Sequence, residues 1–191
     1  MKTPSIIRCQ WCLDHDETYV RYHDEEWGVP VFNDRKHFEF LILEGAQAGL
    51  SWATILKRRE GYRTAFADFD AEKVAGYTEE QIQELLGFTG IIRNNLKIRG
   101  AVNNAKRFLE VREETGSFDK YIWGFTGGKT IVNRWGSMKE VPATSIESDN
   151  LALDMKKRGF KFAGSTIMYA HMQACGLVND HTTDCFRYNE V

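Results

Sequence analysis

The residue whose setting most strongly suggests chemistry is Glu44, which lies inside the largely apolar run of residues 38–52. Phe40 and Leu41 precede it by one helical turn, so a helix through this run would remove water from several sides of the carboxylate. Burying a carboxylate costs free energy unless the group is paired or meets a ligand. The first interpretation is therefore a pocket carboxylate at the floor of a cleft, with Trp52 as a wall on which a flat ring stacks.

A second interpretation of Glu44 needs no ligand. The side chain would lie on a narrow solvated face of its helix and pair with Arg58 or Arg59. Aromatic residues before and after Glu44 bear on the choice, because they pack in cores or form the walls of pockets. Such walls around one buried carboxylate suit a flat, electron-poor or cationic ring. These residues are Trp11, Tyr19, Tyr22, Trp27 and Trp52.

Cysteines and histidines near both ends of the chain have the types and spacing of metal ligands. Cys9 and Cys12 form a C-x2-C pair, and His181 and Cys185 form an H-x3-C pair. Zinc takes four sulfur or nitrogen ligands in a tetrahedron, and spacing alone favours these four residues, with His23 as the runner-up. The alternative is a packed thiol with two surface histidines. A filled set of four would make the zinc structural, and it would hold both ends of the chain together.

The turn at residues 85–92, LLGFTGII, separates two expected helices and resembles the hairpin of a helix-hairpin-helix element. In such an element, backbone N–H groups at the start of a helix face a DNA phosphate without reading the base sequence. Gly90 would allow the close approach, and Arg93 and Lys97 would add positive charge. An ordinary packing corner between two helices explains the same residues.

The elements that must position these groups are helical. Periodicity of i, i+3, i+4 and capping signals predict helices at about residues 16–24, 34–48, 52–60, 78–87, 94–113, 117–125, 148–158 and 164–176, with a short turn within 66–77. Residues 126–147 contain Gly127, Gly128, Gly136 and Pro142 and are expected to form a long irregular loop. The predicted fold class is all-α, with residues 1–191 as one unit of two closely packed lobes that share a cleft.

Composition limits the class of protein. The 191 residues carry a net charge of −2 and are 42% hydrophobic, which argues against a disordered chain and a broadly basic nucleic-acid binder but permits a local basic patch. The apolar runs are too short to cross a bilayer, and residues 1–8 lack the apolar region of a signal peptide. We therefore expect a cytoplasmic protein whose four cysteines are free or bind metal.

Four longer strings resemble one protein family. They are residues 22–30 (YHDEEWGVP), 43–52 (LEGAQAGLSW), 156–162 (KKRGFKF) and 172–181 (MQACGLVNDH). They resemble the 3-methyladenine DNA glycosylase I family of bacterial alkylation-repair enzymes, and the similarity extends from about residue 8 to residue 185. The resemblance implies a helix-hairpin-helix DNA glycosylase fold with a zinc clamp that joins the N- and C-termini.

The same resemblance assigns roles to residues. The zinc ligands become Cys9, His23, His181 and Cys185, in place of the set with Cys12 that spacing favours. Glu44 and Tyr22 become the base-recognition and catalytic pair, Trp52 the stacking residue, and Trp11, Tyr19 and Trp27 further pocket positions. Related helix-hairpin-helix glycosylases use an Asp after the hairpin; Asp119 is the nearest such position, although this family does not depend on one.

The implied activity is hydrolysis of the N-glycosidic bond of 3-methyladenine in double-stranded DNA, by a monomer acting in the bacterial cytoplasm. The base would be flipped into the pocket, and its positive charge would already weaken the bond. Two other hypotheses stay open from the residues alone. One is a zinc-clamped DNA-binding module without catalysis, and the other is thiol redox chemistry at Cys9 and Cys12.

Overall fold

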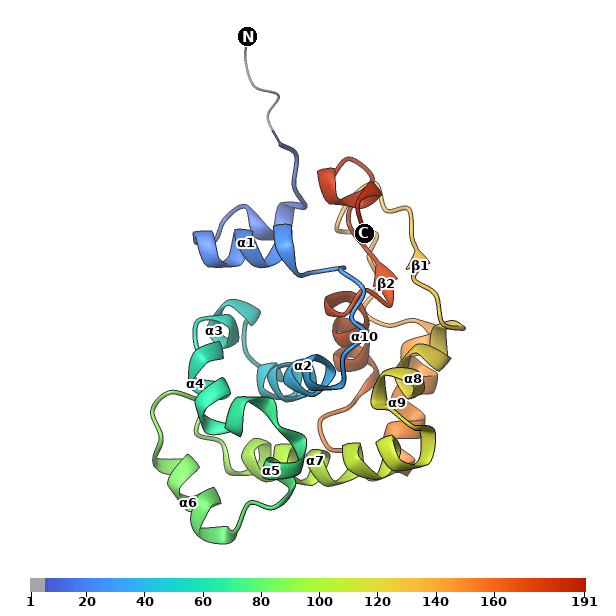
Figure 1. Cartoon of the computed structure of the whole chain (residues 1–191). Coiled ribbons are helices and arrows are strands. Elements are labelled where there is room, and N and C mark those ends of the chain that lie inside the picture. Colours follow the sequence, from blue (N-terminus) through green and yellow to red (C-terminus); the bar gives the residue numbers. More distant parts are fainter. Residues whose placement is uncertain (1–5) are drawn as a thin grey trace.

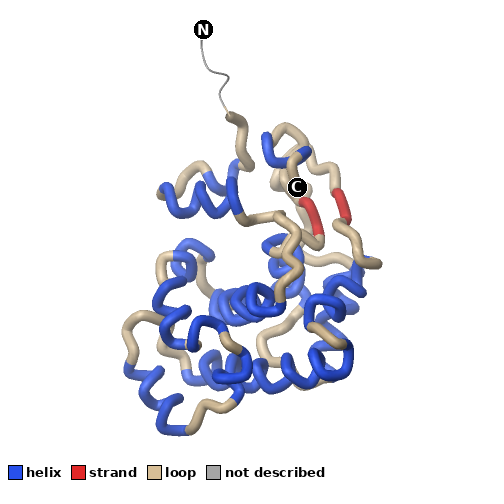
Figure 2. Tube along the Cα trace, in the orientation of Figure 1, coloured by secondary structure: helices blue, strands red, loops and turns tan. Residues whose placement is uncertain are grey.

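The computed structural model describes residues 6–191, so residues 1–5 of the expected N-terminal segment lie outside the described residues. The α helices and strands are α1 (Glu17–Glu25), α2 (Asp34–Gln47), α3 (Trp52–Leu56), α4 (Arg59–Ala65), α5 (Ala71–Ala75), α6 (Glu79–Gly87), α7 (Asn95–Thr115), α8 (Phe118–Trp123), β1 (Ile131–Val132), α9 (Ile146–Lys157), α10 (Ser165–Ala174) and β2 (Val178–Asn179). Short 3-10 helices occur at Gln10–Cys12, Ala67–Phe69, Gly124–Thr126 and Phe186–Asn189. The all-α prediction is confirmed, and the two strands form a parallel pair of only two residues each (Figure 2).

Helix α2 is the central element, with α3, α4, α7, α8 and α10 packed around it (Figure 1). Ten consecutive residues, from His37 to Ala46, are buried. The Asn33 side chain caps the start of the helix by accepting a hydrogen bond from the backbone N–H of Lys36, and Gly49 follows its end with φ +78°. Because each buried Leu, Ile or Phe contributes roughly 1.5–3 kcal/mol, tertiary packing rather than helix propensity fixes α2.

The hairpin between α6 and α7 lies against α4. A capping box begins α6, where Thr78 and Gln81 exchange hydrogen bonds. At the turn, the backbones of Gly61 and Gly90 approach so closely that a Cβ on Gly61 would lie 2.1 Å from the Gly90 carbonyl oxygen. A glycine at position 61 is therefore required by packing, and this contact fixes the hairpin on the body of the protein.

Helix boundaries differ from the expected ones at several places, of which two have a clear physical reason. The expected helix at 52–60 is two helices, α3 and α4, because the backbone leaves the helical conformation at Arg58 (φ −104°, ψ 5°). The last but one helix begins at Ile146 instead of residue 148, because Ser145 is the N-cap and Ser148 is its reciprocal capping partner. In both cases several residues are suitable as the first or last residue of a helix, and the tertiary structure determines which one is used.

The N-terminal segment and the C-terminal segment lie side by side (Figure 1). The backbone N–H of Phe186 donates to the carbonyl of Ile7, and that of Gly28 donates to the carbonyl of Gln173 at the end of α10. Part of the expected 126–147 loop pairs with the C-terminal segment through β1 and β2. Within the described chain, none of the helices combines the length and apolar character needed to span a membrane.

Candidate active site and metal centre

A cavity of about 230 Å³ opens beside the C-terminal half of α2. Its walls come from elements that are distant in sequence: the first 3-10 helix, α1, α2, α3, α10 and the loop after β1. The lining residues are Trp11, Tyr19, Tyr22, Trp27, Glu44, Gln47, Trp52, Met138, Ala170 and Gln173. All six residues that the sequence predicts for base binding therefore lie around one space.

Glu44 is the acidic residue of this cavity, and its side chain is nearly fully buried, with 4% of the residue exposed. Among the described residues, no group donates a hydrogen bond to its carboxyl or forms an ion pair with it. Desolvation by burial raises the pKa of Glu44 to about 8. The surroundings therefore favour the protonated form unless a cation or a hydrogen-bond donor enters the cavity.

The alternative pairing of Glu44 with an arginine is wrong. Arg59 binds Glu26 with N–O distances of 2.7 and 2.8 Å, and it binds the buried Glu39 at 2.8 Å. Arg58 directs a guanidinium nitrogen to the carbonyl of Thr54. Both arginines are engaged elsewhere, which leaves Glu44 to the cavity.

The aromatic walls form two groups around Glu44. Trp11 packs edge-on against Tyr19 and Trp27, with ring centroids 5.4 and 5.0 Å apart, whereas the ring of Tyr22 lies 5.5 Å from that of Trp52. The indole Nε1 atoms of Trp11 and Trp52 are buried without a hydrogen-bond partner within residues 6–191. Burial raises the pKa of Tyr22 well above its usual value, so its phenol stays protonated. The cavity thus combines stacking surfaces, donors and one carboxyl.

The four ligands that the resemblance implies meet at one buried point. The Nδ1 atom of His181 lies 3.5 Å from Cys9 Sγ and 3.6 Å from Cys185 Sγ, and His23 Nε2 lies 3.5 Å from Cys185 Sγ. Tetrahedral zinc with its usual bond lengths requires sulfur–nitrogen separations of about 3.6 Å. All four ligand atoms lie within 4.8 Å of one another, so this set could hold a metal ion.

The second nitrogen of each histidine is also bound, which orients the rings. His23 Nδ1 donates to Asp24 Oδ1 at 2.8 Å, and His181 Nε2 donates to the carbonyl of Trp27 at 3.1 Å. His23 Nε2 and His181 Nδ1 therefore carry the lone pairs, and these two atoms face the cysteine sulfurs. Arg8 holds Asp24 with three hydrogen bonds. Because Trp27 also lines the cavity, the metal centre and the cavity share a wall.

Cys12 lies outside this set. Its thiol donates to the carbonyl of Cys9 at 3.1 Å, within the 3-10 turn that holds both residues. The quartet with Cys12 that spacing favours is therefore wrong for the group that the structure assembles. The redox hypothesis is less well supported as well, because Cys9 Sγ faces His181 and the Cys12 thiol donates to a backbone carbonyl.

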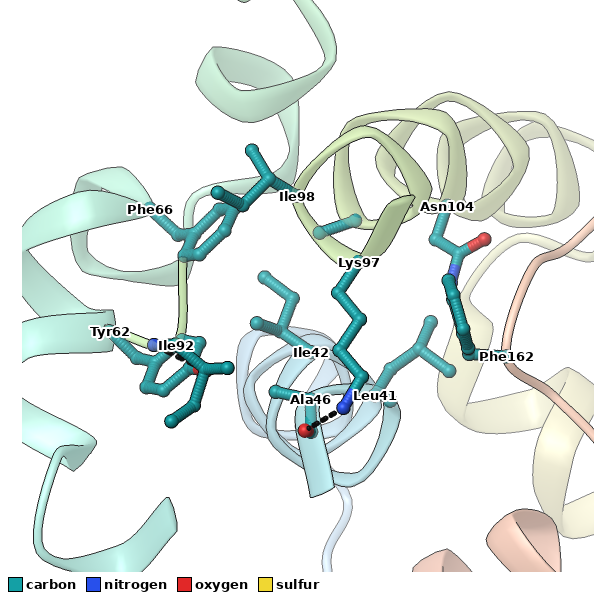
Figure 3. A pocket seen from close by; sticks show the side chains of 12 residues that line it. Leu41, Ile42, Ala46, Tyr62, Phe66, Ile92, Lys97, Ile98, Asn104 and Phe162 are labelled. Atoms are coloured by element: carbon teal, nitrogen blue, oxygen red, sulfur yellow. Dashed lines mark hydrogen bonds between the residues drawn. The ribbon is translucent and has the colours of Figure 1, made fainter. Parts of the chain in front are cut away.

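The three predicted DNA-binding residues have different surroundings. Gly90 packs on Gly61, while Arg93 is exposed and has no ion-pair partner in the described part of the chain. Lys97 instead points to the end of α2, where its Nζ donates to the carbonyl of Ala46 at 2.8 Å (Figure 3). The same Nζ also donates to the carbonyl of Ala48 at 2.6 Å. Lys97 is thus held by the protein itself, and its contact with DNA stays a prediction, as does that of Gly90 and Arg93.

Other residues of the site were missed from the sequence. Gln47, Met138, Ala170 and Gln173 line the cavity. Of these, Gln47 had a local signal, since it lies one turn after Glu44 on the same helix. Asp119 does not line the cavity; its backbone N–H binds Asp34, and its Oδ1 lies 3.5 Å from His37 Nε2.

Comparisons with known proteins agree with this geometry. Residues 11–188 match the family model described as methyladenine glycosylase. A DNA-3-methyladenine glycosylase 1 from Escherichia coli (strain K12) is 45% identical over 181 residues, which cover 95% of this chain and 96% of the relative. A crystal structure of 3-methyladenine DNA glycosylase I (TAG) has a TM-score of 0.90 at 48% identity and covers 94% of this chain and 98% of its own. A tyrosine-to-phenylalanine variant of such an enzyme, in complex with 3-methyladenine, has a TM-score of 0.88 at 36% identity, with coverage of 90% and 92%.

Proposed function

The chain belongs to the methyladenine glycosylase family, and from this premise we propose that it hydrolyses the N-glycosidic bond of 3-methyladenine in alkylated duplex DNA. The products are the free base and an abasic site. The observation that carries the proposal is the unpartnered, buried carboxyl of Glu44 in a cavity walled by Tyr22 and Trp52. Binding the DNA backbone alone requires no such cavity, so a DNA-binding module without catalysis fits less well.

The cavity suits a methylated adenine that has been rotated out of the helix. Trp52 stacks on the ring, the other aromatic side chains form the remaining walls, and Glu44 accepts a hydrogen bond from the exocyclic amino group. The unpaired indole N–H groups of Trp11 and Trp52 and the Tyr22 phenol are available to ring acceptors. A base that presents a carbonyl to the ionised form of Glu44 leaves buried acceptors unpaired, which costs about 1–3 kcal/mol.

The chemistry follows from the charge of the substrate. Methylation at N3 makes adenine a cationic leaving group, so the bond breaks with little general-acid help. As it breaks, positive charge moves to the sugar, and ionised Glu44 stabilises that charge while water attacks C1′. Entry of the cationic base favours loss of the proton that burial keeps on the Glu44 carboxyl, since opposite charges lower the pKa of a buried acid.

We assign the metal-ligand set Cys9, His23, His181 and Cys185 to one structural zinc ion. Two neutral imidazoles and two thiolates are the donor set that tetrahedral zinc prefers, and the sulfur–nitrogen distances support it. No position is left for a substrate, so the ion clamps the chain ends together. It thereby fixes α1, which bears Tyr22, against the C-terminal segment.

The hairpin after α6 is the proposed contact with the DNA backbone. Gly90 fixes the turn, exposed Arg93 faces a phosphate, and Lys97 adds charge beside the end of α2. Residues 1–191 would act as one glycosylase unit, with two lobes on either side of the cavity, and as a monomer. The free thiols suit the reducing cytoplasm, where bacterial DNA lies.

The test is incubation with methylated duplex DNA, followed by chromatography of the released bases and a count of abasic sites. The expected result is free 3-methyladenine and an equal number of abasic sites. Glu44→Gln, which keeps the size of the side chain, is expected to slow release. Tight binding of the duplex by wild-type protein with no released base would instead establish the DNA-binding module.

A further inference from the structure

A second group of metal-ligating side chains lies between α2 and α10, apart from the zinc clamp. His37, His171 and Cys175 are each fully buried. His171 Nε2 lies 3.2 Å from His37 Nδ1 and 3.6 Å from Cys175 Sγ. The three ligand atoms all lie within 4.8 Å of one another. Neither the cavity of Glu44 nor the hairpin includes any of them.

The tautomer of His37 is set by its surroundings. Its Nε2 faces the carbonyl oxygen of Val31 at 3.1 Å and Asp119 Oδ1 at 3.5 Å, and both of these atoms are acceptors. Nε2 therefore carries the hydrogen, and Nδ1 directs its lone pair at His171. A metal-binding histidine typically donates its other N–H to a carbonyl or a carboxylate in this way.

Hydrogen bonds among His37, His171 and Cys175 cannot give every donor and acceptor of these side chains a partner. If His171 Nε2 donates to His37, the Cys175 thiol loses its acceptor and His171 Nδ1 keeps an unpaired lone pair. If His171 Nε2 accepts from Cys175, two nitrogen lone pairs face each other at 3.2 Å. A cation between the three atoms uses both lone pairs and the sulfur at once, which leaves only the N–H of His171 unpaired.

We infer that His37 Nδ1, His171 Nε2 and Cys175 Sγ form a second metal site for a soft d10 cation, either Zn²⁺ or Cu⁺. Zinc and copper(I) both take imidazole and thiolate ligands. Tetrahedral zinc places two nitrogens about 3.3 Å apart and nitrogen and sulfur about 3.6 Å apart, close to the separations given above. Binding replaces the proton of the Cys175 thiol, which is released to solvent.

The site joins two helices that build the active cavity. His37 lies two turns before Glu44 on α2, and His171 lies between Ala170 and Gln173, which line the cavity from α10. A cation here ties α2 to α10 and so stabilises the relative position of the two walls. This inference does not depend on the proposed glycosylase activity or on the zinc clamp.

The test is the metal content of protein purified from cells grown with added zinc and, in a second preparation, with added copper. Mass spectrometry of wild-type protein is compared with Cys175→Ser and His171→Phe, which keep the approximate size of each side chain. Cys12→Ser is the matched control, because Cys12 is buried but belongs to neither group. We expect about one metal equivalent to be lost in Cys175→Ser and in His171→Phe and none in Cys12→Ser.

Crystals of the wild-type protein give a second readout that does not require any variant to fold. Anomalous diffraction at the zinc and copper edges should place an ion about 2.0–2.1 Å from His171 Nε2 and identify the element. Anomalous density confined to the Cys9–Cys185 clamp in both preparations would overturn the inference. So would a metal content that neither Cys175→Ser nor His171→Phe lowers.

Discussion

The rings of Tyr22 and Trp52 lie 5.5 Å apart, centroid to centroid, at an interplanar angle of 49°. This contact brings α1 against the start of α3, and both residues line the cavity that contains Glu44. Trp52 also stacks on Phe40, which precedes Glu44 by one turn of α2. The aromatic walls and the carboxyl are therefore fixed to one another before any base enters.

The proposed zinc clamp predicts which cysteines bind the zinc ion. Cys9→Ala, His23→Ala, His181→Ala and Cys185→Ala should each remove about one equivalent of zinc and destabilise the fold by several kcal/mol, since a structural zinc contributes on the order of 10 kcal/mol. Cys12→Ala should keep this zinc. Metal analysis and urea unfolding measure both effects. Loss of zinc in Cys12→Ala with retention in Cys9→Ala would move the site to Cys12.

The buried carboxyl of Glu44 predicts a pH-dependent stability. Its pKa is about 8 in the folded chain, against an ordinary value of 4.5, so the unfolded chain loses this proton at lower pH. The unfolding free energy should therefore fall as pH rises from about 4.5 to about 8, by at most about 1.4 kcal/mol per unit, and this group should have no further effect above pH 8.

Urea unfolding of wild-type protein and Glu44→Gln between about pH 5 and about pH 8 measures this contribution. As pH rises, the unfolding free energy of wild-type protein should fall relative to that of Glu44→Gln. Glu113→Gln, a change at an exposed site on α7, should leave the wild-type profile unaltered. A constant difference between wild type and Glu44→Gln would mean that Glu44 is ionised in the folded chain throughout.

The hairpin residues should separate into two kinds of effect. Arg93→Ala should weaken binding to duplexes of any sequence and flatten the log–log salt dependence by roughly one unit. Lys97→Ala removes two hydrogen bonds at the end of α2 and should cost roughly 1 kcal/mol of stability, beyond any change in the salt slope.

Lys106→Ala is the control for both hairpin variants, because this exposed lysine lies on the same helix, away from the turn. Fluorescence anisotropy at several salt concentrations gives the slopes, and urea unfolding gives the stabilities. An unchanged salt slope in Arg93→Ala would place the DNA on another face of the protein.

Met138 brings the loop after β1 to the cavity. The loop is anchored by Asn133 and Trp135, whose side chains both donate to Asp180 at 2.7 Å. Met138→Ala should weaken binding of free 3-methyladenine on the order of tenfold, because it removes one apolar wall. Lys139→Ala, the exposed neighbour, should bind like wild type. Quenching of tryptophan fluorescence measures both, and equal affinities would exclude Met138 from the occupied part of the cavity.

Local signals were sufficient for much of the fold. Asn33, Thr78 and Ser117 each cap the start of a helix that the sequence predicts. The start of α9 was misplaced because Ser145 and Ser148 are both good caps, and the choice depends on Ser148 being buried against Ser165. The β1–β2 pair is too short to leave an alternating pattern, so periodicity could not reveal it.

The site was predictable only in part. Spacing placed both Cys9 and Cys12 among the ligands and left His23 as the runner-up, because it could not show that a 3-10 turn directs two thiols three residues apart to different partners. Long strings of family-like sequence resolved that choice. His37 and His171 belong to none of the predicted sites, and they meet only because α2 packs on α10. Contacts of that kind depend on tertiary packing, which no local pattern encodes.

The set of bases that wild-type protein releases from one sample of methylated duplex DNA tests the role of Glu44 most directly. Glu44 accepts a hydrogen bond from the amino group of a cationic adenine, whereas 7-methylguanine presents a carbonyl at the corresponding edge. We expect release of 3-methyladenine with little or no 7-methylguanine. We also expect Glu44→Gln to discriminate less well against neutral adenine in product binding. Release of 7-methylguanine at a comparable rate would contradict the assignment of Glu44 as the group that selects the base.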